Sequence, residues 1–457
     1  MHATVEEITD HPRSWSESKK LFTVFGGIVA SFTAVFGTSV YVASIPGIVK
    51  EFAVSETLAI SLVSIYSLGQ VIGPAITSAS SELFGRRRVL QLSILTALIF
   101  TIGSASAQTF RSLAVLRFLA SVAVSPCASF ALGVINDVWD VESSTMGTAM
   151  VLIAAMASIV PAALGMVCGA PLVVATSDWR WTFWLTAIFL GVAFIAVIPM
   201  PESFGPQIAR QKARRLKKDA PDRGDWKQLV WTLLARPVYM LFVEPVIFPT
   251  ALVSAIAQGV VFCLYAAYPL ILSTAYSFNL TQIGLSFLPM FVGNVLAIPI
   301  LGLIDRLPFI RTHFSASNGV DSTLLPERRL SGAVLGGVMM PISLFWLGWT
   351  ARRDIHWIVP LLSGLLFGMS YTLILISYAI YKNDIYGAKY GSSAFAAEVM
   401  IRYVLSAPVP LFTVQMIKRI GFNWSMSLVG FICVALVPIP WIFIYYGARL
   451  RRKSRFV

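Results

Sequence analysis

Charged side chains are scarce in this sequence. Asp, Glu, Lys and Arg together make up 12% of the 457 residues, about half the share that is typical of a soluble domain. Hydrophobic residues make up 57%, and the mean hydropathy is +0.76. A chain with so few polar side chains has no means of covering its apolar surface in water. The composition therefore excludes a soluble globular protein and predicts one that is embedded in a lipid bilayer.

Residues that build metal, disulfide and catalytic sites are also scarce. The four cysteines fall inside apolar runs, as small buried hydrophobes do, and they form no disulfide framework. The four histidines are scattered without metal-ligand spacing. No Gly-x-x-x-x-Gly-Lys-Ser/Thr phosphate loop and no Ser/His/Asp constellation occurs. We therefore expect no enzyme, no bound metal and no ATP-driven pump.

Acidic residues are fewer than basic ones. The sequence has 35 Lys and Arg but 22 Asp and Glu, which gives a net charge of +13. A basic soluble protein would suggest nucleic acid as a partner. Here the basic residues lie in short segments between apolar runs, which indicates membrane topology instead. The first twenty residues hold four acids and no apolar core, so they are not a cleavable signal peptide.

Long apolar runs dominate the rest of the sequence. A helix needs roughly 20 apolar residues to cross the hydrocarbon core, and runs of that length predict twelve spans. They are expected near 21–46, 57–79, 89–108, 111–135, 145–174, 179–200, 238–273, 282–303, 329–350, 355–379, 391–417 and 422–447. Because lipid offers no hydrogen-bond partners, these segments must be helices. The predicted fold class is an all-α integral membrane protein.

The longest internal polar stretch, 201–237, divides the spans into two groups of six. We predict an N-terminal half at 21–200 and a C-terminal half at 238–447, with tails at 1–20 and 448–457. Two six-span halves around a midplane site are typical of secondary transporters. Only seven Lys and Arg fall on the loops that an inside N-terminus would place outside, so both termini are predicted to be cytoplasmic. The basic loop 201–237 is read as an anchor to lipid headgroups, or else as a partner-binding segment.

Two neighbouring segments carry a resemblance to a known family. They read Tyr66-Ser-Leu-Gly-Gln-Val-Ile-Gly-Pro74 and Ser81-Glu-Leu-Phe-Gly-Arg-Arg-Arg88. Further matches are Asn136-Asp-Val-Trp139, Trp179-Arg-Trp-Thr-Phe-Trp184 and Pro326-Glu-Arg-Arg-Leu330. The chain resembles the major facilitator superfamily, and more closely its fungal twelve-span drug:proton antiporter branch.

The loop after the second span has two readings. Gly85 permits a tight turn, and the basic residues after it suit cytoplasmic headgroups, so a plain topological anchor would explain it. The resemblance implies more, because in the family this loop latches one half against the other in one alternating-access state. That role falls here on Glu82, Gly85 and Arg86.

Four charged residues lie inside predicted spans and away from the span ends: Arg117, Glu244, Glu398 and Arg402. Charge at membrane depth is costly and marks functional sites, and the resemblance implies a proton-coupling or cavity role for Arg117. Arg117 could instead snorkel to the interface. Glu398 and Arg402 are four apart and can pair, so Glu398 is a proton carrier, a contact for a cationic substrate, or a partner of Arg402. Glu244 could titrate during transport or bind a loop arginine.

Polar side chains deep in spans are the remaining candidates. Gln70, Gln258, Tyr265 and Asn294 could line a substrate cavity, or could only hydrogen-bond between helices. In the fifth span, Pro161, Gly165 and Gly169 are what remains of a helix-packing motif that the branch associates with antiport. Its paired Gly-Pro and Gly-Gly elements are missing, so uniport stays open beside proton antiport.

The leading functional hypothesis is a secondary active transporter that exports small amphipathic organic compounds, such as a drug, toxin or secondary metabolite. It would use alternating access and the proton gradient, with no other cofactor. Alternatives are an organic-acid carrier anchored by Arg117 or Arg402, a uniporter, and a non-transporting membrane sensor. The expected partners are an organic substrate, protons and membrane lipids, around a monomer in the plasma membrane or, failing that, the vacuolar membrane. Two glycosylation sequons, at Asn279 and Asn423, fall on predicted outer loops close to span ends.

Overall fold

The computed structural model describes residues 12–139, 145–215, 235–306, 326–452 and 454–456. The side chains of some residues inside these ranges, 74–83 among them, are not described. Within the described ranges every regular element is a helix. Among the described residues, eleven segments are long and apolar enough to cross a bilayer, and the shorter apolar helix α9 stands where the remaining predicted span was expected. The all-α, multi-pass architecture predicted from the sequence is therefore confirmed.

The first nine helices come from residues 17–215. They are α2 (Glu17–Val40), α3 (Ile45–Phe52), α4 (Glu56–Phe84), α5 (Arg86–Ala105), α6 (Phe110–Val138), α7 (Thr145–Ile159), α8 (Pro161–Thr176), α9 (Trp181–Val197) and α10 (Gly205–Arg215). Two short 3₁₀ turns, Pro12–Ser14 and Tyr41–Ser44, stand before α2 and between α2 and α3.

The later helices come from residues 236–452. They are α12 (Arg236–Val243), α13 (Ile247–Tyr276), α14 (Leu280–Leu285), α15 (Leu288–Arg306), α17 (Ser331–Thr350), α18 (Ile358–Ser406), α19 (Val409–Ile420), α20 (Phe422–Leu436) and α21 (Pro438–Arg452), with a 3₁₀ turn at Pro326–Leu330.

The outer surface of the bundle is apolar. Phe242, Ile195 and Leu92 expose 78%, 68% and 65% of their side chains. Such exposure would be unfavourable in water, but it is what a lipid-facing helix surface requires. The apolar outer surface of the bundle therefore supports the prediction from the hydrophobic pattern that these helices span a bilayer.

Helix breaks are where the structure departs from the predicted spans. The predicted span 355–379 and the first part of the predicted span 391–417 lie in the single helix α18, which bends at Gly387 (φ 55°, ψ −164°) in place of a loop, and the rest of 391–417 lies in α19. The run 145–174 is divided before Pro161, and the run 422–447 before Pro438. Proline lacks the N–H that would continue the helix ladder, whereas a hydropathy window detects only apolarity.

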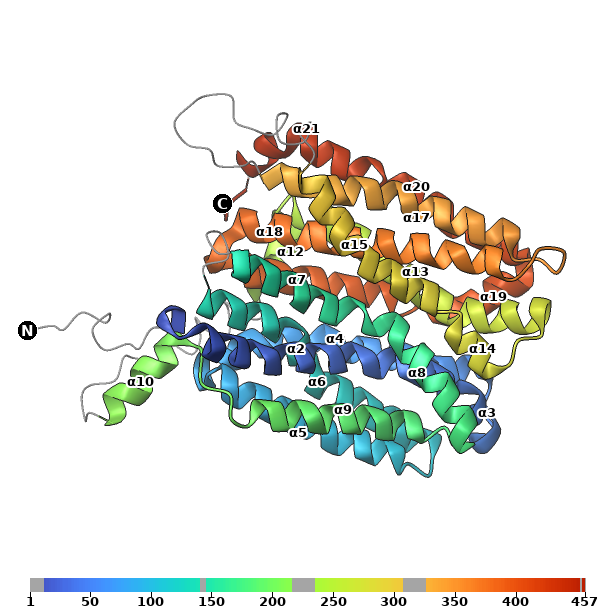
Figure 1. Ribbon diagram of the computed structural model, residues 1–457, viewed down its shortest axis with the longest axis horizontal. Coiled ribbons are helices and arrows are strands. Elements are labelled where there is room, and N and C mark those ends of the chain that lie inside the picture. The colour runs from blue at the N-terminus through green and yellow to red at the C-terminus, as the bar shows by residue number, and fades with distance from the viewer. Residues whose placement is uncertain (1–11, 140–144, 216–234, 307–325, 453, 457) are drawn as a thin grey trace, which may run out of the picture.

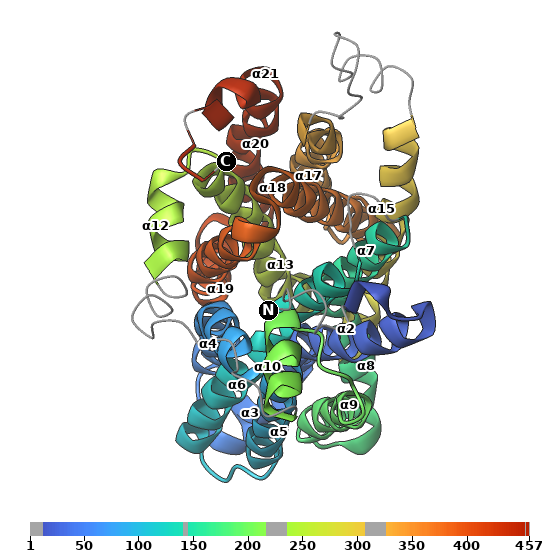
Figure 2. The same cartoon turned by 90° about the vertical axis from the view of Figure 1, so that its left-hand side faces the viewer.

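The helices run roughly side by side, and both termini lie at the same end of the bundle (Figure 1). Viewed along the helices from that end, α2–α9 form one group and α12–α21 another, with α10 lying across the end of the first group (Figure 2). At the opposite end the two groups touch, since α14 packs on α8 and α19 on α4. There the amide of Gln415 donates a 3.1 Å hydrogen bond to the hydroxyl of Thr57.

Candidate transport and coupling site

A buried ion pair lies beside the break in α18. The ammonium group of Lys382 contacts the carboxylate of Glu398, and each residue exposes 2% of its surface. Lys382 precedes Gly387 and Glu398 follows it, so the bend brings the two sides of α18 together. Lys382 was not among the candidate residues predicted from the sequence, because it lies three residues past the predicted end of its span. A basic residue so close to a span end was the available signal.

Arg402 is not the partner of Glu398. It makes no ion pair with any residue that the structure describes, and its Nε is buried without a hydrogen-bond partner. Its guanidinium lies 5.4 Å from the ring centre of Tyr403, and Tyr371 and Lys382 are within electrostatic range. The i,i+4 pairing that the spacing allowed is therefore replaced by the contact of Glu398 with Lys382, and Arg402 has no ion-pair partner among the described residues.

Arg117 is enclosed by aromatic rings. Its guanidinium carbon lies 3.8 Å from the ring centre of Tyr41, 4.8 Å from Tyr66 and 5.6 Å from Phe183. Its Nε donates to the carbonyl of Leu62 at 3.3 Å. No described carboxylate pairs with it, so ring faces and carbonyl oxygens offset the charge.

The small cavity that Arg117 lines also has Thr33 and Ser104 in its wall. It has room for about one water molecule. Arg117 therefore lines a small cavity, in keeping with the cavity role that the resemblance implies for it.

The four polar cavity candidates are all hydrogen-bonded between helices. Gln70 donates to the carbonyl of Ala34 at 3.3 Å, and Gln258 accepts from the hydroxyl of Tyr371 at 2.6 Å. Asn294 accepts from Thr372 at 3.2 Å, but its Nδ2 has no partner.

Tyr265 differs from the other three because its bond crosses between the two groups of helices. Its hydroxyl donates to the carbonyl of Ala162 in α8 at 2.5 Å. A contact of this kind must change if the two groups move relative to each other.

The residues of the fifth span place α8 against α2. The hydroxyl of Ser39 donates to the carbonyl of Pro161 at 2.6 Å. A Cβ at Gly165 would collide with Ser39 and the backbone of Val40, and one at Gly169 would press on Val40. Glycine is therefore required here for close backbone approach.

The loop after α4 holds helices of its own group together. Arg86 forms a bidentate ion pair with Asp137 at the end of α6, and Ser203 donates to the same carboxylate at 3.1 Å. Gly85 adopts φ 89°, and the side chain of Glu82 lies outside the described residues. The contacts described for Arg86 stay within the first group of helices, so the predicted latch between halves is not formed by them.

Glu202, which follows α9, binds the end of this loop and was not among the candidate residues predicted from the sequence. It accepts hydrogen bonds from the backbone N–H of Arg86 at 2.9 Å and of Arg87 at 3.3 Å, where α5 begins. Burial raises the pKa of Glu202, and these N–H donors oppose that shift. A carboxylate at a helix N-terminus satisfies donors that have no partner in the helix.

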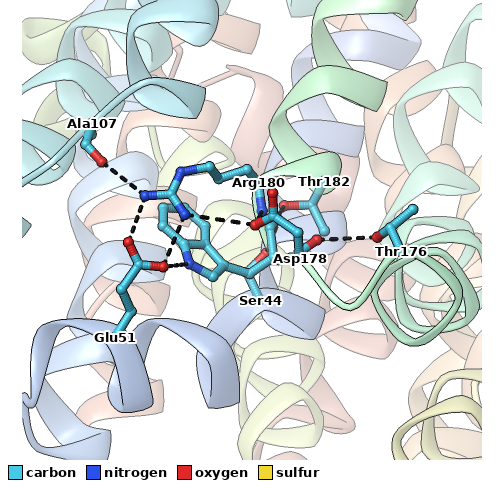
Figure 3. Close-up of polar contacts among 8 residues, drawn as sticks. Ser44, Glu51, Ala107, Thr176, Asp178, Arg180 and Thr182 are labelled. Carbon is cyan, nitrogen blue, oxygen red and sulfur yellow. Dashed lines mark hydrogen bonds and ion pairs between the residues drawn. The ribbon is translucent and has the colours of Figure 1, made fainter.

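A second charged cluster lies between α3 and the start of α9 (Figure 3). The carboxylate of Glu51 accepts from both Nη atoms of Arg180, at 2.5 and 2.9 Å, and from the indole N–H of Trp179 at 2.7 Å. The hydrogen bonds that Arg180 donates to Glu51 raise the pKa of Arg180. Glu51, Trp179 and Arg180, here named the clasp, connect α3 to the start of α9.

Glu244 ends α12 and is 2% exposed. Its carboxylate accepts from the hydroxyl of Tyr386 at 2.9 Å and from groups of Ser454 and Arg455. Glu244 therefore binds a tyrosine and residues that follow α21, in place of the loop arginine that was considered as its partner.

A bundle of apolar helices in two groups, with paired and unpaired charges buried between helices, is the architecture of a membrane transporter. A family model described as Major Facilitator Superfamily matches residues 27–410. The chain belongs to the major facilitator superfamily.

Several curated fungal proteins are similar over almost the whole chain. Polyamine transporter 4 of Saccharomyces cerevisiae is 31% identical over 98% of this chain and 72% of its own length. Efflux pump FUB11 of Gibberella moniliformis is 32% identical over 94% of this chain and 72% of its own length. The multidrug transporter mdrA of Aspergillus fumigatus is 31% identical over 98% and 74%.

Among solved structures, a partially occluded inward open conformation of the xylose transporter XylE from E. coli is similar in fold. It has a TM-score of 0.66 and 19% identity, and the match covers 93% of this chain and 99% of that one. At this identity the likeness concerns the fold alone.

Proposed function

We propose that this chain exports small amphipathic organic compounds by alternating access, driven by the proton gradient. Relatives whose names describe efflux pumps and multidrug transporters support export. The observation that carries proton coupling is the buried cluster of Lys382, Glu398 and Arg402. An intramembrane carboxylate among cations is a group whose protonation responds to solvent access.

The charges of the spans favour neutral or anionic substrates over polycations. Only two carboxylates fall inside the predicted spans, Glu244 and Glu398. Both are engaged, by Tyr386 and by Lys382 respectively. Arg402 holds positive charge with an unpartnered Nε. A polyamine would require free carboxylates, whereas a carboxylic acid or a polar aromatic compound would meet Arg402 and neighbouring tyrosines.

The orientation proposed is cytoplasmic at the end that carries both termini, as the basic loops favour. The contacts of α14 with α8 and of α19 with α4 then lie on the outer side. The plasma membrane is the proposed location, with a monomer in contact with anionic headgroups through the basic segment 201–237, and with protons as the second transported species.

The test is transport in sealed proteoliposomes with an imposed pH gradient. The probes are one aromatic scaffold carrying a carboxylate, a neutral amide or an amine, together with spermidine. We expect accumulation of the acid and the amide that collapses with a protonophore. Arg402→Gln should lower uptake of the acid by at least tenfold and leave the amide within about threefold. Preferential transport of spermidine would refute the proposed substrate class.

Movement of probes only down their own gradients would show a uniporter and remove proton coupling. Binding without any transport would favour the sensor. Glu398→Gln should abolish accumulation of the amide above equilibrium, and unchanged proton-driven accumulation in that variant would remove Glu398 from the coupling mechanism.

A further inference from the structure

The residues that follow α21 are seated against two other helices. Ser454, Arg455 and Phe456, here named the strap, lie on α12 and α18. The hydroxyl of Ser454 donates to Oε2 of Glu244 at 2.6 Å, and the backbone N–H of Arg455 donates to Oε1 at 3.0 Å. One buried carboxylate therefore receives two hydrogen bonds from a segment that is 210 residues away in sequence.

Aromatic contacts complete the seat of the strap. The ring of Phe456 meets the rings of Tyr239 and Tyr390 edge-on, with centroids 6.2 and 5.2 Å apart. Arg455 Nη1 donates to the hydroxyl of Tyr239 at 3.1 Å. Edge-to-face pairs of this kind are each worth about 0.5–1.5 kcal/mol beyond area burial. The strap is thus held by a polar anchor and an aromatic anchor.

The strap spans the break in α18. Tyr386 precedes Gly387 and shares the carboxylate of Glu244, and Tyr390 follows Gly387 and packs on Phe456. The strap therefore connects α12 to both sides of the bend. A change in the bend angle would pull Tyr390 away from Phe456 or Tyr386 away from Glu244.

We propose that Ser454 is a phosphorylation site and that its phosphorylation releases the strap. A protein kinase would transfer the γ-phosphoryl group of ATP to Ser454 Oγ, with loss of the hydroxyl proton and release of ADP. Arg451 and Arg452 precede the serine, which suits a kinase that selects basic residues on the N-terminal side. Arg452 is exposed, whereas Arg451 pairs with Glu327, so the last turn of α21 must fray for the kinase to use both arginines.

The phosphate would be incompatible with the docked strap. The hydroxyl oxygen now lies at hydrogen-bond distance from Glu244, and a phosphoserine carries about −1.5 to −2 charges at pH 7. Like charges at this separation repel strongly in a buried setting. Because Ser454 is half-buried in the docked state, the kinase acts on the undocked strap, and the phosphate then prevents its return.

The first test is limited trypsin digestion of the full-length protein in detergent, followed by intact-mass analysis. Ser454→Asp should speed cleavage after Arg452 or Arg455 at least fivefold. Ser454→Ala loses the hydrogen bond to Glu244 and the one accepted from the N–H of Phe456, but adds no charge, and should change the cleavage rate by less than threefold. The double variant Glu244→Gln with Ser454→Asp should regain protection, because the amide can donate to the new carboxylate. Cleavage at Arg210 in α10 is the control for general unfolding.

Protection of Ser454→Asp equal to that of the wild type would overturn the proposal. So would a double variant that is digested as fast as Ser454→Asp, since charge repulsion would then not be the cause.

The modification itself is tested with ATP and a purified kinase that prefers arginine before serine. We expect phosphate on Ser454, none on the Ser454→Ala variant, and fast digestion of the modified protein. Absence of phosphate even on Phe456→Ala, in which the aromatic anchor is removed, would overturn the assignment of the site.

A transport assay measures the consequence, and this arm alone rests on the proposed function. Release of the strap frees the bend at Gly387, so Ser454→Asp should raise the turnover number at least twofold with the apparent KM nearly unchanged. Unchanged turnover together with fast digestion would leave the strap intact as a structure and overturn its regulatory role. If the wild type itself does not transport, the proposed function fails while the digestion result stands.

Discussion

Replacing Glu398 by Gln removes the negative member of a buried ion pair. Lys382 and Glu398 are each 2% exposed and contact each other across the bend of α18. In the variant, the Lys382 ammonium group would keep a hydrogen-bond acceptor but lose its counter-charge, with the positive Arg402 nearby.

The expected cost follows from this burial. Breaking a buried pair by removing one partner typically costs about 3–5 kcal/mol, while replacing both partners by apolar residues is often neutral. We expect about 3 kcal/mol for Glu398→Gln, and about 4 kcal/mol for Lys382→Met, which leaves a carboxylate alone. The double variant Lys382→Met with Glu398→Leu should lie within about 1 kcal/mol of the wild type.

The assay is reversible denaturation in mild detergent, followed by the fluorescence of the twelve tryptophans. A double-mutant cycle of Lys382→Met, Glu398→Leu and the variant that combines them isolates the pair from other effects of each change. Additive losses, with a coupling energy below about 1 kcal/mol, would refute the reasoning from burial. The stable double variant also tests mechanism, since proton-driven accumulation that survives in it would show that Glu398 carries no coupled proton.

Three further changes test other contacts. Gly165→Leu should prevent close packing of α8 on α2 and abolish the monodisperse protein on gel filtration, whereas the same change at Gly191, which has open space around its Cβ position, should be tolerated. Gly85→Ala should destabilise the protein by about 1–3 kcal/mol, because φ 89° disfavours a side chain and the new Cβ would meet Glu202. Thermal unfolding measures this loss, and an unchanged midpoint temperature would contradict it. Arg180→Gln should cost only about 1 kcal/mol, since the clasp is partly exposed, and the loss should shrink in high salt; a loss that is independent of salt would point to packing on Trp179.

The sequence by itself determined that the chain spans a membrane many times and where most spans lie. Apolarity over about twenty residues is a local property, and lipid permits only helices for it. The loop motif around Gly85 and Arg86 and the small residues of the fifth span were equally visible, because a turn and a close helix approach each require particular residue types at fixed spacing. Family membership followed from those same segments.

Partners of the buried charges were decided only by the tertiary structure. The spacing of Glu398 and Arg402 suggested an ion pair between them. The bend at Gly387 instead brings Glu398 into an ion pair with Lys382, 16 residues earlier in the sequence. Glu244 likewise binds Ser454, which no local pattern connects to it. A buried charge takes whichever counter-group the packing of distant helices brings within reach, and desolvation makes that choice decisive. Sequence spacing along one helix carries no information about groups that arrive from another segment of the fold.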